Sequence, residues 1–143
     1  AVTGSHQITV QMDQLLSETD FDAFDLLVLP GGMPGTLHLE ACDELMEQLD
    51  RFYSAGKWVA AICAAPQIFG HRGYLKGRKA TSFPSMEKEL GGAFVTHGAA
   101  EVDGNVITGR GMGCAIDFAL KIIGCLISEE EAAAQAERIV YER

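Results

Sequence analysis

The stretch Trp58-Val59-Ala60-Ala61-Ile62-Cys63-Ala64-Ala65-Pro66 decides the fold. The apolar run over 58–62 has the length and composition of a strand that is buried on both faces of a parallel sheet. Proline lacks a backbone N–H and fits the first turn of a helix, so Pro66 predicts that a helix begins directly after this strand. Cys63 is therefore expected where a buried strand turns into a helix.

A second buried strand is predicted over 26–29, where Leu26-Leu27-Val28-Leu29 is continuous and apolar and ends at Pro30-Gly31-Gly32. A helix is predicted between the two strands, because apolar residues recur there at helical spacing and Gly56 follows them. One face of this helix is expected to pack on the sheet through Cys42, Leu45, Met46, Leu49, Phe52 and Tyr53.

Further strands are predicted on both sides of this region. Near the start of the chain, Ile8, Val10 and Met12 alternate with polar neighbours, which is typical of a half-buried strand. A hairpin turn is expected at Asp103-Gly104. The remaining short strands are expected over 79–82, 93–96, 99–102 and 106–108.

Two helices are predicted after the last strand. The first is apolar and runs over 113–127. Ser128 and Glu131 have the spacing of a capping box, which predicts the start of a last helix that carries residues 132–141. The alternation of strands and helices predicts an α/β sheet, and the length of 143 residues is that of a single domain over 1–143.

The composition excludes several functional classes. Hydrophobic residues make up 48% and charged residues 22% of the chain, which is typical of a folded soluble domain. The formal net charge of −9 would repel phosphate backbones and anionic lipid headgroups, so neither nucleic acid nor a membrane is expected as a partner. The longest apolar stretch, over 116–127, is interrupted by Asp117 and Lys121 and is shorter than the ~20 residues of a membrane span.

The start of the chain and its cysteines predict a location. No basic segment followed by an apolar run opens the chain, so a cytoplasmic location is expected. The chain begins with Ala1 and not with Met, and it is expected to be incomplete at its N-terminus. The cysteine spacing matches neither a disulfide framework nor a zinc site, which favours reduced thiols and no metal at Cys42, Cys63, Cys114 and Cys125.

Cys63 is the leading candidate for a reactive residue. The small residues on either side of it allow a sharp turn from strand to helix, as in the nucleophile elbow of hydrolases. Backbone N–H groups at the start of a helix favour a thiolate, which attacks carbonyl groups and is readily oxidised. The alternative is a buried cysteine whose only role is packing.

The loop over 30–35 follows the other predicted buried strand. Ligands bind at the carboxyl ends of strands in open α/β sheets, so this loop and Cys63 are expected at one edge. Adjacent glycines let backbone N–H groups approach a developing oxyanion. The amides of Gly32 and Ala64 are therefore the candidate oxyanion donors, and the alternative is an ordinary strand-to-helix turn.

The glycine-rich segment over 109–113 lacks both the complete dinucleotide fingerprint and a Walker-type Lys-Ser/Thr. Nucleotide binding is therefore rejected, and a corner that permits close packing is favoured. A cysteine nucleophile usually needs a base, but no histidine stands beside a recognisable motif. Surface positions are expected for His6, His38, His71 and His97, and packing roles within helices for Cys42, Cys114 and Cys125.

Three segments together resemble the ThiJ/PfpI superfamily: Val28-Leu29-Pro30-Gly31-Gly32, Ala60-Ala61-Ile62-Cys63-Ala64-Ala65-Pro66, and Thr108-Gly109-Arg110-Gly111 with Asp117-Phe118-Ala119-Leu120. They are most similar to the branch of the Parkinson-associated protein deglycase and its bacterial ThiJ-type relatives. The resemblance implies a flavodoxin-like, doubly wound and mostly parallel sheet, of the class I glutamine amidotransferase type. It also implies that Cys63 is the reactive elbow cysteine, that the Gly32 and Ala64 amides line its oxyanion site, and that the protein is a homodimer.

The sequence departs from this family in three places. The family has a βα unit before the start of this sequence, with a glutamate that hydrogen-bonds the reactive sulfur, and no residue here matches it. Phe83 stands where some members have a histidine near the cysteine, and Ala64 stands where the protease branch has a histidine. Peptide hydrolysis is therefore not expected, whereas chemistry that needs only a reactive thiolate remains open.

The resemblance and the elbow together predict a cysteine-dependent stress-response enzyme of the deglycase or glyoxalase type. Cys63 would add to a small reactive carbonyl, such as methylglyoxal or its adducts, and no cofactor is expected. The alternative is a redox sensor or chaperone without turnover, in which Cys63 is oxidised to a sulfinic acid. A ThiJ-type role in the metabolism of thiazole monophosphate, a thiamine precursor, ranks last, because no residue here recognises a thiazole or a phosphate.

Overall fold

The computed structural model describes residues 1–142, and its centre is a sheet with the strand order β3-β4-β8-β7. In this sheet, β3 (Leu26–Leu29), β4 (Trp58–Ile62) and β8 (Val106–Gly109) run parallel, and β7 (Ala100–Asp103) is antiparallel to β8. This mostly parallel sheet confirms the α/β class that the alternating pattern predicted.

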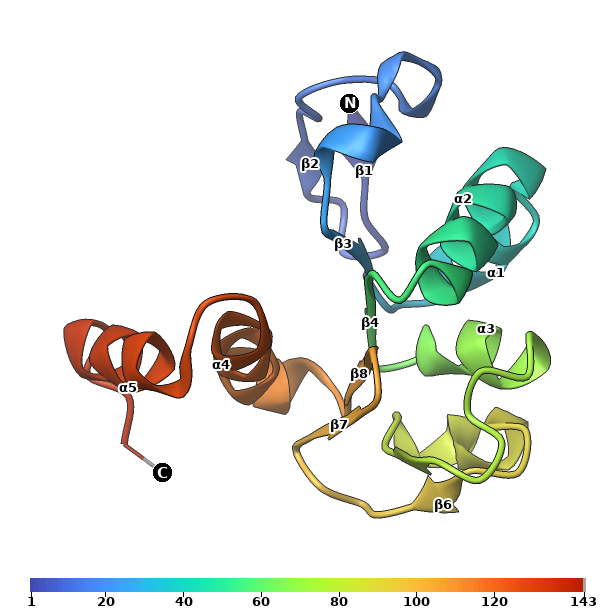
Figure 1. Cartoon of the computed structure of the whole chain (residues 1–143). Helices are drawn as coiled ribbons and strands as arrows, with labels where there is room; N and C mark the ends of the chain where they lie inside the picture. Colours follow the sequence, from blue (N-terminus) through green and yellow to red (C-terminus); the bar gives the residue numbers. More distant parts are fainter. Residues whose placement is uncertain (143) are drawn as a thin grey trace.

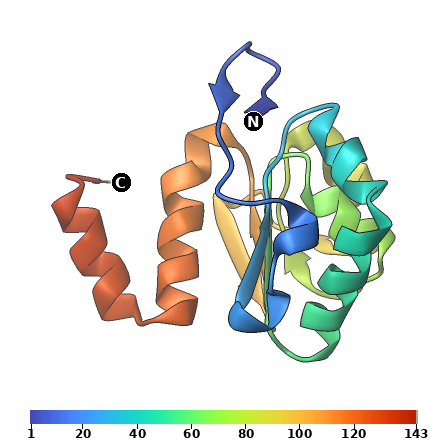
Figure 2. The same ribbon diagram turned by 90° about the horizontal axis from the view of Figure 1, so that it is seen from above.

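Helices cover both faces of the sheet (Figure 1). One face carries α1 (Gly35–Glu40), α2 (Asp43–Ser54) and α3 (Pro66–His71), and the other carries α4 (Ala115–Leu126) and α5 (Glu129–Arg138). Turning the molecule shows that α5 lies on the outer side of α4 and not on the sheet (Figure 2). No helix within residues 1–142 is both long and apolar enough to cross a membrane.

The larger core lies between the sheet and the helices α2 and α3. The apolar stripe predicted for α2 is buried there, through Leu45, Met46, Leu49 and Phe52. The small residues of β4 let helices approach closely on both sides, since Ala60 and Ala61 are both fully buried. On the opposite face, a smaller cluster joins Ala60 and Ile107 to Phe118 of α4.

Two expectations about strand burial were wrong. The strand over 26–29 forms, but Val28 is 46% exposed, because β3 is an edge of the described sheet and α4 packs mainly on β8 and β7. The predicted strand over 8–12 is only Thr9–Val10 (β2), paired with Val2–Thr3 (β1) in a hairpin that projects from the body (Figure 2). Its apolar side chains are exposed and not half-buried, with Ile8 at 68%.

The other predicted elements agree with the structure to within a few residues. The short strands are β5 (Lys79–Ala80) and β6 (Phe94–Val95), which pair with each other and not with the main sheet. The Ser128 Oγ accepts the Glu131 N–H at 3.1 Å, which confirms the capping box of α5. The helix α1 was not predicted, and short 3-10 helices add Leu16–Glu18 (η1), Phe21–Ala23 (η2), Pro84–Glu89 (η3) and Met112–Cys114 (η4).

The His71 ring of α3 contacts both α1 and η3. It lies in the last turn of α3, with Nδ1 2.6 Å from Glu40 Oε1 of α1 and Nε2 3.2 Å from Glu89 Oε2 of η3. The hydrogen bond to Glu40, supported by Glu89, raises the pKa of His71 above its usual value against the smaller opposing effect of burial. A protonated His71 therefore holds α1 and η3 together.

We expect the stabilisation by His71 to depend on pH. Because its pKa is higher in the folded than in the unfolded chain, the contribution is complete below the unfolded pKa of about 6.5 and is lost as the pH rises through the folded pKa. His71→Gln should lower the free energy of unfolding at about pH 6 by less than ~1 kcal/mol, since the ring is partly exposed, and should have a smaller effect at about pH 9.

Urea denaturation of both proteins at the two pH values measures this difference. The matched control is His38→Gln, because the His38 ring makes no hydrogen bond with any residue among 1–142 and should show no such trend. An equal effect of His71→Gln at both pH values would contradict the ion-pair role.

Candidate active site

Cys63 lies directly after β4, at the bend that leads into α3. Its φ of +65° is in the left-handed region, which is uncommon for a residue with a Cβ. Two main-chain hydrogen bonds hold this conformation: the Cys63 N–H donates to the Gly109 carbonyl at 2.9 Å, and the Phe83 N–H donates to the Cys63 carbonyl at 2.8 Å. The cysteine is half-buried, as expected for an elbow residue and not for a core one.

The bend continues through small buried residues into the helix. Ala64 and Ala65 are both buried, and the Ala65 N–H donates to the Ile62 carbonyl at 3.2 Å. Pro66 occupies the first turn of α3, as predicted. Ala64 lies between the end of β4 and the start of α3, so its N–H donates no hydrogen bond within the strand or the helix.

Gly31 is the residue of the 30–35 loop that packs on the elbow. A Cβ on Gly31 would lie 2.6 Å from the Ile62 carbonyl oxygen and 2.7 Å from the Cys63 Cβ. The loop can therefore approach Cys63 only because this residue has no side chain. The sequence motif predicted a role for Gly32 and none for Gly31. The adjacent glycine pair was the signal that could have indicated the close approach at Gly31.

Gly32 adopts a φ of +93°, and its carbonyl accepts both the N–H and the Oγ1 hydroxyl of Thr36 at 2.9 Å each. Thr36 is fully buried, so it fixes the carbonyl of the Gly32–Met33 peptide, directly after the peptide that carries the Gly32 N–H. Within the described residues, neither the Gly32 N–H nor the Ala64 N–H donates a hydrogen bond. Both amides are thus available as donors beside the elbow, and their role as an oxyanion site stays a prediction.

The glycine corner over 109–113 is the third segment that contacts the elbow, through the Gly109 carbonyl. A Cβ on Gly109 would lie 2.8 Å from the Phe118 ring and 2.9 Å from the Ile62 side chain. This glycine lets α4 pack closely on the sheet, which supports the packing role that was favoured over nucleotide binding. Its carbonyl also fixes Cys63, a contribution that no sequence motif indicated.

Three of the four histidines have side-chain hydrogen-bond partners other than Cys63. The Nδ1 of His97 lies 2.8 Å from Glu87 Oε1, the Nδ1 of His6 lies 3.2 Å from the Ser5 hydroxyl, and His71 lies between two glutamates. In the described part of the chain no side chain forms a hydrogen bond with the Cys63 Sγ. The structure thus assigns no histidine as the base of this site.

Two of the other cysteines, Cys42 and Cys125, pack against core clusters. Cys42 precedes α2 and contacts the larger core, and Cys125 of α4 contacts the smaller cluster. Burial, more than the neighbouring Glu129, raises the pKa of the Cys125 thiol, so it is a weaker nucleophile. Cys114 lies at the end of η4, directly before α4, and is also half-buried.

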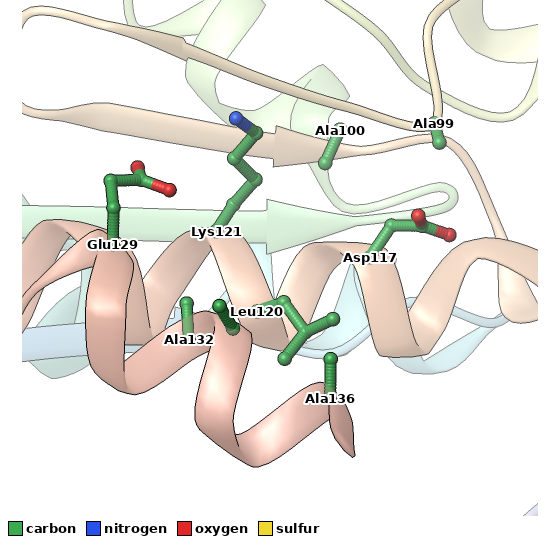
Figure 3. Close-up of a pocket in the computed structure, with 9 residues that line it drawn as sticks. Ala99, Ala100, Asp117, Leu120, Lys121, Glu129, Ala132 and Ala136 are labelled. Carbon is green, nitrogen blue, oxygen red and sulfur yellow. The ribbon is translucent and has the colours of Figure 1, made fainter. Parts of the chain in front are cut away.

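One surface hollow borders the 30–35 loop, and a second lies elsewhere on the molecule. A hollow of about 730 Å³ lies between the β1–β2 hairpin and the 30–35 loop, and Gly31 and Gly32 line it although Cys63 does not. Another, of about 350 Å³, lies between α4, α5 and the start of β7, where Asp117, Lys121 and Glu129 surround an alanine-rich floor (Figure 3). No cysteine or histidine lines the second hollow, so the elbow remains the candidate site.

Comparison with known proteins identifies the family. The model of the DJ-1/PfpI family matches residues 1–124. The protein dj-1beta of Drosophila melanogaster is 35% identical over 142 residues, which cover 98% of this chain and 76% of that protein. A deglycase of Pyrococcus abyssi is 40% identical over 112 residues, covering 76% of this chain and 66% of that protein.

Other relatives are much longer than this chain. The matching region covers 30% of the protein DJ-1 homolog B and 34% of the homolog A of Arabidopsis thaliana, which are 38% and 37% identical to it.

Solved structures confirm the fold class. The crystal structure of DJ-1beta from Drosophila melanogaster superimposes with a TM-score of 0.91 at 34% identity and covers 99% of this chain and 77% of that one. Oxidised DJ-1 from Toxoplasma gondii gives a TM-score of 0.93 at 31% identity, with 99% and 78% covered. These matches confirm the doubly wound, flavodoxin-like architecture. The chain therefore belongs to the DJ-1/PfpI family and, within it, to the DJ-1-like deglycase branch.

Proposed function

We propose that this chain carries the reactive centre of a cysteine-dependent enzyme of the deglycase or glyoxalase type, which acts on small reactive carbonyls. The observation that carries this proposal is the position of Cys63, half-buried at a left-handed bend beside the unused N–H groups of Gly32 and Ala64. The deglycases among the relatives support the same class of activity.

The chemistry begins with addition of the Cys63 thiolate to the aldehyde carbon of a substrate such as methylglyoxal. A carbon–sulfur bond forms, and the electron pair of the carbonyl π bond moves to oxygen. The Gly32 and Ala64 amides would donate to this oxyanion, and protonation of the oxygen gives a hemithioacetal. The Ala64 N–H lies in the same peptide as the Cys63 carbonyl, which accepts the Phe83 N–H at 2.8 Å, so this donor needs no reorganisation during the step.

The later proton transfer needs a base. The family resemblance assigns it to a glutamate that no residue of this sequence matches, and Phe83 stands where some members have a histidine. We therefore assign to this chain the nucleophile and the oxyanion donors, and not the base. The homodimer implied by the resemblance also stays a prediction.

Replacing the nucleophile should abolish activity. In the full-length protein, Cys63→Ser should lower kcat/KM for methylglyoxal by about a thousandfold or more, because an alcohol is a far weaker nucleophile here. The matched control is Cys125→Ser, which should retain activity since that cysteine packs in α4. Lactate formation is the readout, and an unchanged rate with Cys63→Ser would rule the mechanism out.

Separating the 30–35 loop from the elbow should also reduce activity. In Gly31→Ala the new methyl group would meet the Ile62 carbonyl and the Cys63 Cβ, so the loop must move and misplace the Gly32 amide. We expect kcat/KM to fall about a hundredfold, as for a small misplacement of a catalytic group.

Gly35→Ala in the same loop is the control for this variant, because a Cβ there meets nothing within 4 Å and its activity should be unchanged. Thermal unfolding of both variants separates loss of the site from loss of the fold. Full activity in a folded Gly31→Ala protein would remove the loop from the mechanism.

Redox sensing by Cys63 is the second candidate function. It is favoured by the partial exposure of this thiol at the elbow. If the protein is a sensor, mild peroxide should add two oxygen atoms to Cys63 and leave Cys125 unmodified, because burial raises the pKa of the Cys125 thiol. Peptide mass spectrometry gives both results, and selective oxidation without carbonyl turnover would favour the sensor over the enzyme.

A further inference from the structure

We propose that Phe83 sets the substrate preference of this site, and that the carbonyls it accepts best carry an aryl substituent and not a methyl group. This inference rests on the proposed function. It concerns the part of the substrate that does not react.

The backbone places Phe83 directly beside the reactive residue. Its N–H donates to the Cys63 carbonyl at 2.8 Å, so the two residues are joined without an intervening side chain. Its ring edge, at Cδ2, lies 3.7 Å from the position of a Cβ on Gly111. The main chain of Phe83 is thus bonded to the elbow while its ring lies against the glycine corner, which places an apolar side chain next to the reactive residue.

The main chain of Phe83 is held by hydrogen bonds, whereas its ring is accessible to solvent. The Phe83 carbonyl accepts the Met86 N–H at 2.8 Å and the hydroxyl of the buried Ser82 at 3.1 Å. Nevertheless, Phe83 is 47% exposed. An apolar ring that is anchored by its own main chain but left in contact with solvent can gain by packing on an apolar ligand group.

Two polar side chains near this corner have hydrogen-bond partners. The Arg110 Nη1 donates to the His97 carbonyl at 3.0 Å, and the His97 ring pairs with Glu87. Met112, next to Gly111, adds a flexible apolar side chain that is 87% exposed. The exposed side chains of Phe83 and Met112 at this corner are apolar, so they offer a contact surface for an aromatic substituent.

The expected preference is moderate. Packing of one aromatic ring on another contributes enough to change a rate constant by about threefold to tenfold. The ratio of kcat/KM for phenylglyoxal to that for methylglyoxal should therefore fall about threefold to tenfold in Phe83→Ala. Phe94→Ala should leave the ratio unchanged, because Phe94 is also an exposed phenylalanine, at 67%, but lies on β6 opposite Lys79, away from the elbow along the chain.

A second measurement does not depend on turnover. The Cys63 thiolate displaces chloride from 2-chloroacetophenone or from chloroacetone, forming a carbon–sulfur bond while chloride leaves with the electron pair. The rate constant for each reagent is divided by the rate constant for its reaction with glutathione. The ratio of the two normalised values, 2-chloroacetophenone over chloroacetone, gives the aryl preference of the site itself. Cys63→Ser identifies the modified residue, and thermal unfolding confirms that each variant is folded.

The two measurements separate this inference from the proposed function. A lower aryl preference in Phe83→Ala, in alkylation or in turnover, supports the role of Phe83. The alkylation rates can show a lower aryl preference in Phe83→Ala while neither the wild-type protein nor the variants consume phenylglyoxal or methylglyoxal. In that case the proposed enzyme activity fails and the aryl-binding role of Phe83 stands. If Phe83→Ala and Phe94→Ala both keep the wild-type ratios, or if Cys63 reacts with neither reagent, the inference is overturned.

Discussion

The left-handed backbone at Cys63 is the constraint on which the rest of the site depends. A residue with a Cβ in this conformation costs about 1–3 kcal/mol, and it persists only where surrounding contacts determine it. Here the Gly109 carbonyl holds the Cys63 N–H, the Phe83 N–H holds its carbonyl, and Gly31 packs against its Cβ. Three segments far apart in the sequence thus fix a single peptide bend, so the position of the Cys63 thiol is set by the tertiary structure.

The parallel sheet explains how these segments meet. β3, β4 and β8 all end at the same edge, and a parallel arrangement collects the loops that follow them. The loop after β3 brings Gly31 and Gly32, the bend after β4 brings Cys63 and Ala64, and the corner after β8 brings Gly109. Small residues at each of these positions let main chain contact main chain. The binding edge is therefore built largely from backbone groups.

A site of this kind divides its chemistry between backbone and side chains. The N–H groups of Gly32 and Ala64 do not change when side chains are substituted, so in the proposed mechanism the stabilisation of the oxyanion depends on the backbone. Choice of ligand then depends on the few side chains at the entrance, of which Phe83 is joined to Cys63 by a hydrogen bond. In the same region the His97 ring lies 2.8 Å from Glu87, and the Arg110 guanidinium donates to the His97 carbonyl, so these groups stabilise the frame around the site.

The sequence by itself determined the order of the elements, the elbow at Cys63, the proline that starts α3 and the cap of α5, because each follows from local periodicity or from the geometry of one residue type. Only the tertiary structure decided which strands have an open face, as at Val28, and that the first hairpin stands apart from the core. It also showed that Gly31 makes the close approach, and that Gly109 and Phe83 hold the elbow. These contacts join residues distant in sequence, and no local pattern encodes such distances.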